Sequence, residues 1–475
     1  MRFLPIVVTV PMVLGAQAAP LTSADSALIG RILVAEDRRD SADVALAAGD
    51  KHTDVRVRAM AMRARGRIRD PKFAARDSMP ALSAPKVWPE PAWRIRYRGL
   101  AAQRNDCAAL RAAATDSSWQ VRLRAADLAG ASCTPDDSLA KTFMRWVDAL
   151  PRDASRRANG GVSWHLAAHA VVALARVRPD EARVRVAALS RHGQWQVRMY
   201  AARAAAVLGD TVQLRALARD ADDNVKEAAI DALSKLTGHV DDSIYLAALS
   251  ASGAQAVRAA AVALKGSTRM DVRVAAEVLF ERWSLRAIAS ERDVRVALLE
   301  AAGRPATSDR APPARVELPP RTVALALGAD VRLRVTLSDA SGGGSFVVRL
   351  RGDVAPMMSA RVLALAMSGY YNNGNWHRVE PDFVIQGAGP GTNEYVGYKD
   401  YLRDELGTVS HGRGTVGMST RGHDTGDAQW FVNLKDNLRL NPTYTVFAEV
   451  TEGIDVVDGM LEGDVIARIE EVRAG

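Results

Sequence analysis

The first three hundred residues repeat one pattern of polar and apolar positions. A polar loop is followed by Val or Ile, then by Arg or Lys, and then by alanines and aliphatic residues at helical spacing. Apolar positions at i, i+3 and i+4 give each predicted helix a face that one helix pair cannot bury alone. The clearest copies lie about 30 to 40 residues apart, which indicates stacked helical pairs. They include Asp54-Val55-Arg56, Trp119-Gln120-Val121-Arg122, Trp195-Gln196-Val197-Arg198, Asn224-Val225-Lys226 and Ala256-Val257-Arg258.

This pattern resembles the HEAT repeat over most of residues 23–302. The resemblance implies that each valine packs inward and that the arginine bridges to an aspartate of an adjacent repeat. We therefore predict an all-α solenoid over residues 19–302, with a curved surface that binds other macromolecules. His165 and His169 stand four residues apart, a spacing that can hold a metal, but no third ligand is near them in the sequence, so we interpret both as packing residues.

The composition and the spacing of apolar residues change after the repeats. Residues 303–322 contain several prolines, which fix backbone dihedrals and remove hydrogen-bond donors, so this segment is predicted to be an extended linker. Beyond it, residues 331–337 and 345–350 alternate with period two and predict a hairpin, and a helix fits 357–367. Short alternating runs and glycine-rich turns follow. We predict a mostly β second domain over residues 323–475, a closed barrel with flanking helices.

Several motifs of this second domain resemble the cyclophilin family of peptidyl-prolyl cis-trans isomerases. They occur in the family's order, and their joint occurrence makes the resemblance specific. The resemblance covers about residues 323–475 and implies an isomerase that needs no cofactor and no metal. The motifs are Trp376-His377-Arg378, Phe383-Val384-Ile385-Gln386-Gly387, His411-Gly412-Arg413-Gly414, Gln429-Trp430-Phe431 and Tyr444-Thr445-Val446-Phe447.

The resemblance also assigns roles to single residues. Arg378 would place its guanidinium against the proline nitrogen, where it favours the twisted amide, and Gln386 and Phe383 would complete the catalytic group. Val384 replaces a common methionine and Tyr444 a common histidine. The segment 419–421 would pair with the substrate backbone. The substrate-binding residues implied by the family are Val384, Ser419, Thr420, Gln429, Phe431, Leu440 and Tyr444.

The N-terminal segment has the three parts of a secretory signal peptide. A basic start, an apolar stretch and the small-residue motif Ala16-Gln17-Ala18 predict cleavage after residue 18. We therefore expect a periplasmic or secreted protein with no transmembrane segment after cleavage. In such a compartment Cys107 and Cys133 can form a disulfide, although two free buried cysteines fit the sequence equally well.

Charge is unevenly distributed along the chain. Residues 1–322 carry 49 basic and 35 acidic side chains, whereas residues 323–475 carry 14 and 20. A basic surface attracts nucleic acid or anionic lipid, but arginines at a fixed repeat position, interleaved with aspartates, favour ion pairs between repeats. A nucleic-acid partner is therefore not expected. Steep salt dependence of binding by the isolated array would instead indicate that the array binds nucleic acid or an anionic envelope surface.

The predicted function combines both parts of the chain. We expect a peptidyl-prolyl isomerase that assists the folding of exported proteins, with the helical array binding proline-containing clients or a protein partner. The alternative is a non-catalytic scaffold that recognises proline segments.

Overall fold

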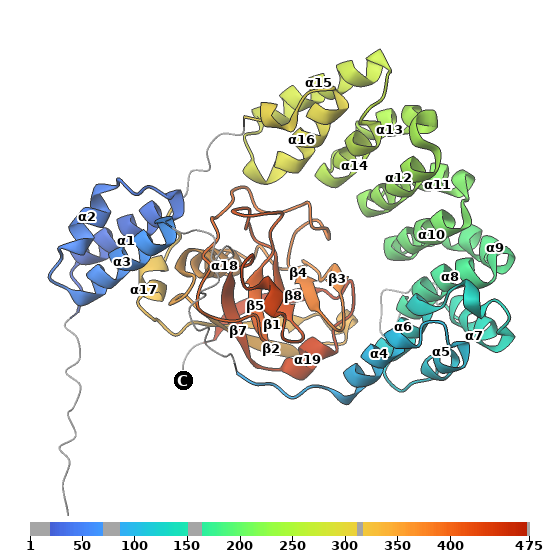
Figure 1. The fold of residues 1–475 in the computed structure, drawn as a ribbon, viewed down its shortest axis with the longest axis horizontal. Helices are drawn as coiled ribbons and strands as arrows, with labels where there is room; N and C mark the ends of the chain where they lie inside the picture. Colours follow the sequence, from blue (N-terminus) through green and yellow to red (C-terminus); the bar gives the residue numbers. More distant parts are fainter. Residues whose placement is uncertain (1–19, 70–85, 151–163, 311–316, 473–475) are drawn as a thin grey trace, which may run out of the picture.

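The computed structural model describes residues 20–69, 86–150, 164–310 and 317–472. The predicted signal peptide, residues 1–18, lies outside the described residues. Within them, no helix is long and apolar enough to cross a membrane. The chain forms three parts: a three-helix unit, an arc of helices, and a C-terminal domain built on one sheet (Figure 1).

The three-helix unit comprises α1 (Ser23–Arg38), α2 (Val44–Asp50) and α3 (Val55–Arg69). Thr22 begins α1 with a capping box shared with Asp25, which satisfies backbone donors at the helix start. The unit does not share the core of the arc. Its buried side chains, among them Ile29 and Ile32, belong to the same hydrophobic core as Leu325 and the inner side chains of the C-terminal sheet.

The arc runs from α4 to α16 and curves around the C-terminal domain (Figure 1). Even-numbered helices from α4 to α16 pack one against the next, and each from α6 onward also packs against an odd-numbered neighbour on the outer side. Stacked helical pairs are thus confirmed. The bounds are α4 (Ala92–Ala102), α5 (Cys107–Ala113), α6 (Trp119–Leu128), α7 (Asp137–Asp148), α8 (His165–Val177), α9 (Pro179–Leu189), α10 (Trp195–Leu208), α11 (Thr211–Leu217), α12 (Asp223–Thr237), α13 (Asp242–Ala248), α14 (Ala254–Leu264), α15 (Met270–Leu285) and α16 (Arg292–Ala301).

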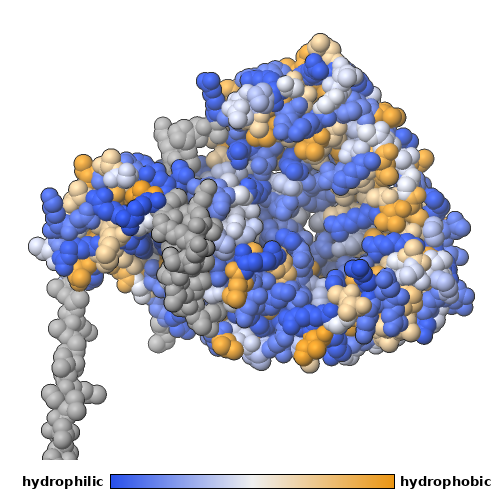
Figure 2. Space-filling model, viewed as in Figure 1, coloured by the Kyte–Doolittle hydropathy of each residue, from blue (hydrophilic) through white to orange (hydrophobic). Residues whose placement is uncertain are grey.

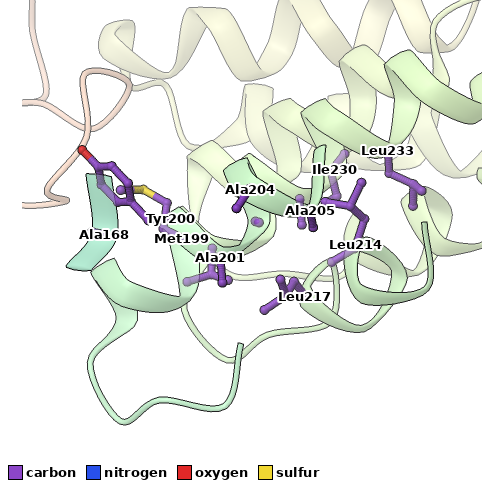
Figure 3. Close-up of a cluster of buried hydrophobic side chains, with 14 of the residues drawn as sticks. Ala168, Met199, Tyr200, Ala201, Ala204, Ala205, Leu214, Leu217, Ile230 and Leu233 are labelled. Carbon is purple, nitrogen blue, oxygen red and sulfur yellow. The ribbon is translucent and has the colours of Figure 1, made fainter. Parts of the chain in front are cut away.

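Alanine and leucine side chains fill the core of the arc. In Figure 3, Ala204 and Ala205 of α10 lie beside Leu214 of α11 and Ile230 of α12. Small alanine side chains let the helix axes approach closely, while the leucines fill the space between them. This packing explains the alanine-rich repeat pattern of the sequence.

The repeated arginine closes the loop before its own helix. Nη1 of Arg58, Arg122 and Arg198 each donates to two backbone carbonyls, six and five residues earlier in the chain. Arg198 also pairs with Asp220 of the next repeat, at 2.7 Å. The arginine thus satisfies loop carbonyls as well as joining neighbours, a role that the repeat pattern alone does not reveal.

A disulfide between Cys107 and Cys133 resolves the alternative that the sequence left open. It joins α5 to the short 3-10 helix η2 (Ala131–Cys133). Further 3-10 turns are η3 (Gly238–Asp241), η4 (Ala289–Glu291) and η5 (Ala306–Ser308). The last of these lies in the proline-containing segment, where Asp309 pairs with buried Arg295 at 2.9 Å.

The C-terminal domain is a curled, mostly antiparallel sheet of eight strands in the order β3-β4-β6-β5-β7-β2-β1-β8. The predicted hairpin is confirmed as β1 paired with β2, and the predicted helix as α18. The elements are α17 (Thr322–Ala326), β1 (Arg332–Leu337), η6 (Asp339–Ser341), β2 (Ser345–Leu350), α18 (Pro356–Met367), β3 (Arg378–Val379), β4 (Val384–Gly387), β5 (Thr415–Met418), β6 (Trp430–Asn433), η7 (Leu438–Leu440), β7 (Val446–Glu452), α19 (Ile454–Asp458) and β8 (Ile466–Val472).

The predicted closed barrel is wrong, because the sheet stays open. Its edge strands β3 and β8 share no ladder among the described residues. Backbone hydrogen bonds on this side join residues 373–376, which precede β3, to residues 463–466 at the start of β8. Strand β3 has two residues, which is too short to pair with two neighbours along its length. The domain is therefore a half-barrel with β3 as an edge strand.

The arc holds the C-terminal domain along much of its inner side. Near one end, Nη2 of the fully buried Arg94 lies 3.1 Å from the Asp458 carboxylate. Midway, His165 Nε2 lies 2.7 Å from the Glu462 carbonyl oxygen. At the other end, Arg421 Nε lies 2.6 Å from Asp293. His165, interpreted from sequence as a packing residue, thus also contributes a polar contact between the two parts.

Candidate active site

Edge strand β3 places Arg378 opposite Gln386 of β4 in the antiparallel register. Arg378 Nη1 donates to Gln386 Oε1 at 3.3 Å, and Gln386 Nε2 donates to Ser419 Oγ at 2.9 Å. Gln386 is buried, whereas the Arg378 side chain is 43% exposed. A buried amide therefore orients a half-exposed guanidinium through one of its nitrogens.

Glu380 also binds Arg378, and sequence reasoning missed it. Its carboxylate oxygen accepts a hydrogen bond from Arg378 Nε at 2.8 Å and a second one from Nη2. The two residues lie two positions apart along the edge of the sheet, so their side chains leave the backbone on the same side. The available signal was its position two residues after Arg378.

A cluster of apolar side chains, the candidate proline pocket, lies beside this polar group. Val384, Phe431 and Leu440 form a small buried cluster of their own, and Phe383 and Tyr444 pack against it. The structure thus brings Phe383 of the implied catalytic group together with four of the implied substrate-binding residues, Val384, Phe431, Leu440 and Tyr444. The Arg378 guanidinium lies 5.8 Å from the centre of the Phe383 ring, which places the cation at the edge of the pocket.

The floor of the pocket depends on one glycine. A Cβ on Gly417 would lie 2.3 Å from the Phe431 ring, so the aromatic side chain rests directly on the backbone of β5. His411 stacks on Phe431 at 5.8 Å, and Tyr444 meets it edge to face at 5.6 Å. Burial lowers the pKa of His411 to about 4, which leaves this ring neutral at physiological pH.

The other predicted substrate-binding residues differ in how they are used. Ser419 contacts Gln386 through its hydroxyl, and its backbone N–H donates to the Gln429 carbonyl. The buried Gln429 side chain instead donates at 2.8 Å to the Asn393 carbonyl and at 2.5 Å to that of Val396. The Thr420 hydroxyl oxygen is buried and has no partner among the described residues. Ser419 therefore belongs to the polar group around Arg378, and Gln429 supports the loop at 391–396.

The arc supplies a wall that the sequence did not predict. A cavity of about 720 Å³ lies between α10, α12 and the C-terminal domain, and both His377 and Arg378 line it. Figure 2 shows the surface hollowed between the arc and this domain. No arc residue was predicted to contribute to the site, because periodicity identifies a buried face but not the distant surface that a helix approaches.

An arginine held by a buried amide beside an apolar cluster, on a curled antiparallel sheet, fits the chemistry of a peptidyl-prolyl isomerase. Residues 333–472 match the model of the family described as cyclophilin type peptidyl-prolyl cis-trans isomerase/CLD. The chain belongs to this family and is a peptidyl-prolyl cis-trans isomerase.

Similarity to individual relatives is confined to about a quarter of the chain. This chain is 37% identical over 123 residues to peptidyl-prolyl cis-trans isomerase-like 3 of Dictyostelium discoideum, and the match covers 25% of this chain and 76% of that protein. It is 34% identical over 130 residues to peptidyl-prolyl cis-trans isomerase B of Bacillus subtilis, covering 27% and 90%. The relatives match the C-terminal domain in length, so the arc is an addition to what they share.

Proposed function

We propose that this isomerase assists the folding of exported proteins and that Arg378 is its catalytic residue. The observation that carries the proposal is the Arg378 guanidinium, oriented by Gln386 at the edge of the apolar pocket. Rotation about an X-Pro amide costs about 18–20 kcal/mol, because delocalisation of the nitrogen lone pair is lost in the twisted state. A guanidinium donor fixed beside the proline ring can form a hydrogen bond with the nitrogen lone pair that is freed in the twisted state.

Isomerisation requires only that the protein bind the twisted amide more tightly than the planar amide. Val384, Phe431 and Leu440 hold the proline ring, and Arg378 donates to the amide nitrogen once that nitrogen becomes pyramidal. Because the planar amide nitrogen is a poor acceptor, the donor stabilises the transition state more than the ground state, which raises kcat. Burial and Arg378 lower the pKa of His377 to about 4, so its imidazole is neutral at physiological pH.

The arc is proposed to be a HEAT-like array that binds the client chain. The inward valines and the Arg198 pair with Asp220 of the next repeat support this assignment. Its inner helices face β3, so a client bound along them would have its prolines presented to Arg378. A long, curved binding surface beside an active site raises the local concentration of substrate.

Export is proposed on two independent grounds. Residues 1–18 have the sequence pattern of a signal peptide, and the disulfide between Cys107 and Cys133 is of a kind that persists in oxidising compartments. The test is a fusion of residues 1–22 to alkaline phosphatase, which is active only after disulfide formation. Phosphatase activity is expected, and its absence in a well-expressed fusion would contradict export.

The catalytic proposal is tested on the full chain with an unfolded client whose slow refolding phase is prolyl isomerisation. Wild-type protein should accelerate this phase, and Arg378→Ala should lose about a hundredfold in kcat/KM. The same variant should still bind a permanently unfolded client, with hydrogen-exchange protection on the inner helices of the arc. Turnover retained by Arg378→Ala would contradict the role of Arg378, and binding without protection of the arc would contradict client binding there.

A further inference from the structure

The cavity beside Arg378 has a floor in the C-terminal domain and a wall in the arc. Trp195 and Met199 of α10 and Glu227 and Asp231 of α12 line one side, and His377 and Arg378 line the other. Its volume of about 720 Å³ falls within the roughly 300–1,000 Å³ of ordinary ligand sites. A chain bound in the proline pocket would therefore have a second site directly next to the catalytic arginine.

Two carboxylates on α12 lack a full complement of positive charge. Glu227 accepts a hydrogen bond from Asn393 Nδ2 at 2.7 Å, but its nearest cation, Arg258 Nη1, stays 3.8 Å away. That guanidinium lies 3.7 Å from the centre of the Tyr395 ring. The Asp231 carboxylate makes no hydrogen bond or ion pair with any described residue. Burial, together with Asp231, raises the pKa of Glu227 to about 7.

The basic side chains that line the cavity compensate for this only in part. The Arg203 guanidinium lies 4.4 Å from the centre of the Tyr200 ring, and Tyr200 in turn donates to Glu462 at 2.8 Å. Lys235 stands one turn after Asp231 on α12, and its charge and that of Arg258 act on this carboxyl, but burial still raises the pKa of Asp231. The wall formed by α12 is therefore the acidic side of the cavity.

His377 provides an independent sign that this cavity takes a ligand. Neither of its ring nitrogens is exposed or has a hydrogen-bond partner among the described residues, although the side chain lines the cavity. Buried polar groups normally have partners, and an orphaned one marks a place where a bound group can supply the missing hydrogen bond. A neutral imidazole offers one donor and one acceptor, which suits a peptide backbone.

We propose that this cavity binds the segment of the client that flanks the isomerised proline and selects a lysine or arginine side chain there. The inference rests on client binding by the arc, as proposed above. The aliphatic stem of such a side chain would pack on Trp195 and Met199, and its charge would lie against Glu227 and Asp231. An acidic side chain would meet two carboxylates, and an apolar one would leave them uncompensated.

The test measures kcat/KM of the full chain by NMR exchange on matched prolyl peptides. Within a set, only one flanking residue changes, between Lys, Gln and Glu, at positions two to five residues on either side of the proline. At one or more positions Lys should exceed Gln about tenfold, with Glu slowest. If the wild type shows no Lys preference at any position, the inference is wrong, while turnover of the Gln peptides would still establish isomerase activity.

Two double variants test whether the carboxylates of α12 cause the preference for lysine. In Glu227→Gln/Asp231→Asn the ratio of Lys to Gln rates should fall below about twofold, because both charges are lost while the amide oxygen of Gln can still accept from Asn393. The control Asp180→Asn/Glu181→Gln removes two charges from outer helix α9 and should keep the wild-type ratio. A preference that survives the first double variant would overturn the assignment to this cavity. Loss of hydrogen-exchange protection on the arc, measured separately, would instead contradict client binding.

Discussion

Arg378 and Gln386 face each other across the β3–β4 ladder, and the Gln386 amide oxygen accepts from Arg378 Nη1 at 3.3 Å. The same amide donates to Ser419 at 2.9 Å, so its orientation is set on both sides. Gln386 is therefore a positioning residue: it fixes where the guanidinium points without contacting the substrate itself. An exposed arginine on an edge strand would otherwise sample many rotamers, at a cost of about 1.5–2 kcal/mol to order it on substrate binding.

We expect Gln386→Leu to lower kcat about tenfold with a smaller change in KM, because the proline pocket stays intact while the guanidinium loses its anchor. Gln386→Glu keeps an acceptor for Arg378 and should recover part of kcat. Steady-state kinetics on a prolyl peptide separates the two parameters. An equal loss in both variants would show that Gln386 acts through packing rather than through its amide oxygen.

Glu380 competes with the substrate for Arg378. Because the pair is half exposed, breaking it costs little, about 0–1 kcal/mol. Glu380→Gln should therefore raise kcat/KM only about two- to threefold, because the ion pair that it removes is weak. The variant should also show a smaller dependence of the rate on salt concentration. Peptide isomerisation at low and high ionic strength measures both effects. A fall in kcat/KM would mean that Glu380 orients Arg378 productively.

Asp458 pairs with two buried guanidinium groups, Arg94 of the arc at 3.1 Å and Arg413 of its own domain at 2.6 Å. Asp458→Asn leaves both cations without their counter-charge and should cost about 3–5 kcal/mol in the free energy of unfolding. Asp382 is the matched control, since it too pairs with two cations, but those of Arg98 and Lys435 are 40% and 36% exposed. Asp382→Asn should cost less than about 1 kcal/mol in denaturant unfolding. Equal costs would contradict the burial argument.

Stability should depend on pH through Glu405. This buried carboxylate accepts from the backbone of Met357 and Met358 and shares Arg67 with Glu36, and burial raises its pKa to about 7. Between its unfolded value near 4.5 and about 7 the folded state binds the extra proton, so its contribution to stability is lost as pH rises.

Glu405→Gln removes this ionisation. From pH 5 to pH 8 the variant should gain about 2 kcal/mol relative to wild type in the free energy of unfolding. Denaturant unfolding of both proteins at the two pH values gives this double difference. A difference between variant and wild type that does not change with pH would contradict the raised pKa.

Sequence patterns identified local features well. Apolar spacing predicted the stacked helices, and the motif around Arg378, Phe383 and Gln386 named residues that the fold does bring together. Such motifs succeed because neighbouring strand positions fix geometry within a few residues. Glu380 escaped notice because its pairing depends on side-chain conformation at an edge strand, which no periodicity records.

Contacts between elements that lie far apart in the sequence could not be predicted from local patterns. The apolar face of α1 is visible in the sequence, but what covers it is not: Gly30 packs against Leu318 rather than against the arc. Whether β3 and β8 meet depends on the accumulated curl of eight strands. The cavity shared by Glu227 and Arg378 depends on the curvature of the whole arc.

The common core of the three-helix unit and the sheet has a consequence for biosynthesis. Ile29 near the start of the chain and Ile469 near its end lie in one cluster, so that cluster is complete only after almost the entire polypeptide has emerged. Contacts of such high sequence separation form late and slowly. The arc, whose contacts are between neighbours, can assemble first, and the isomerase would then become active last, within a binding surface that already exists.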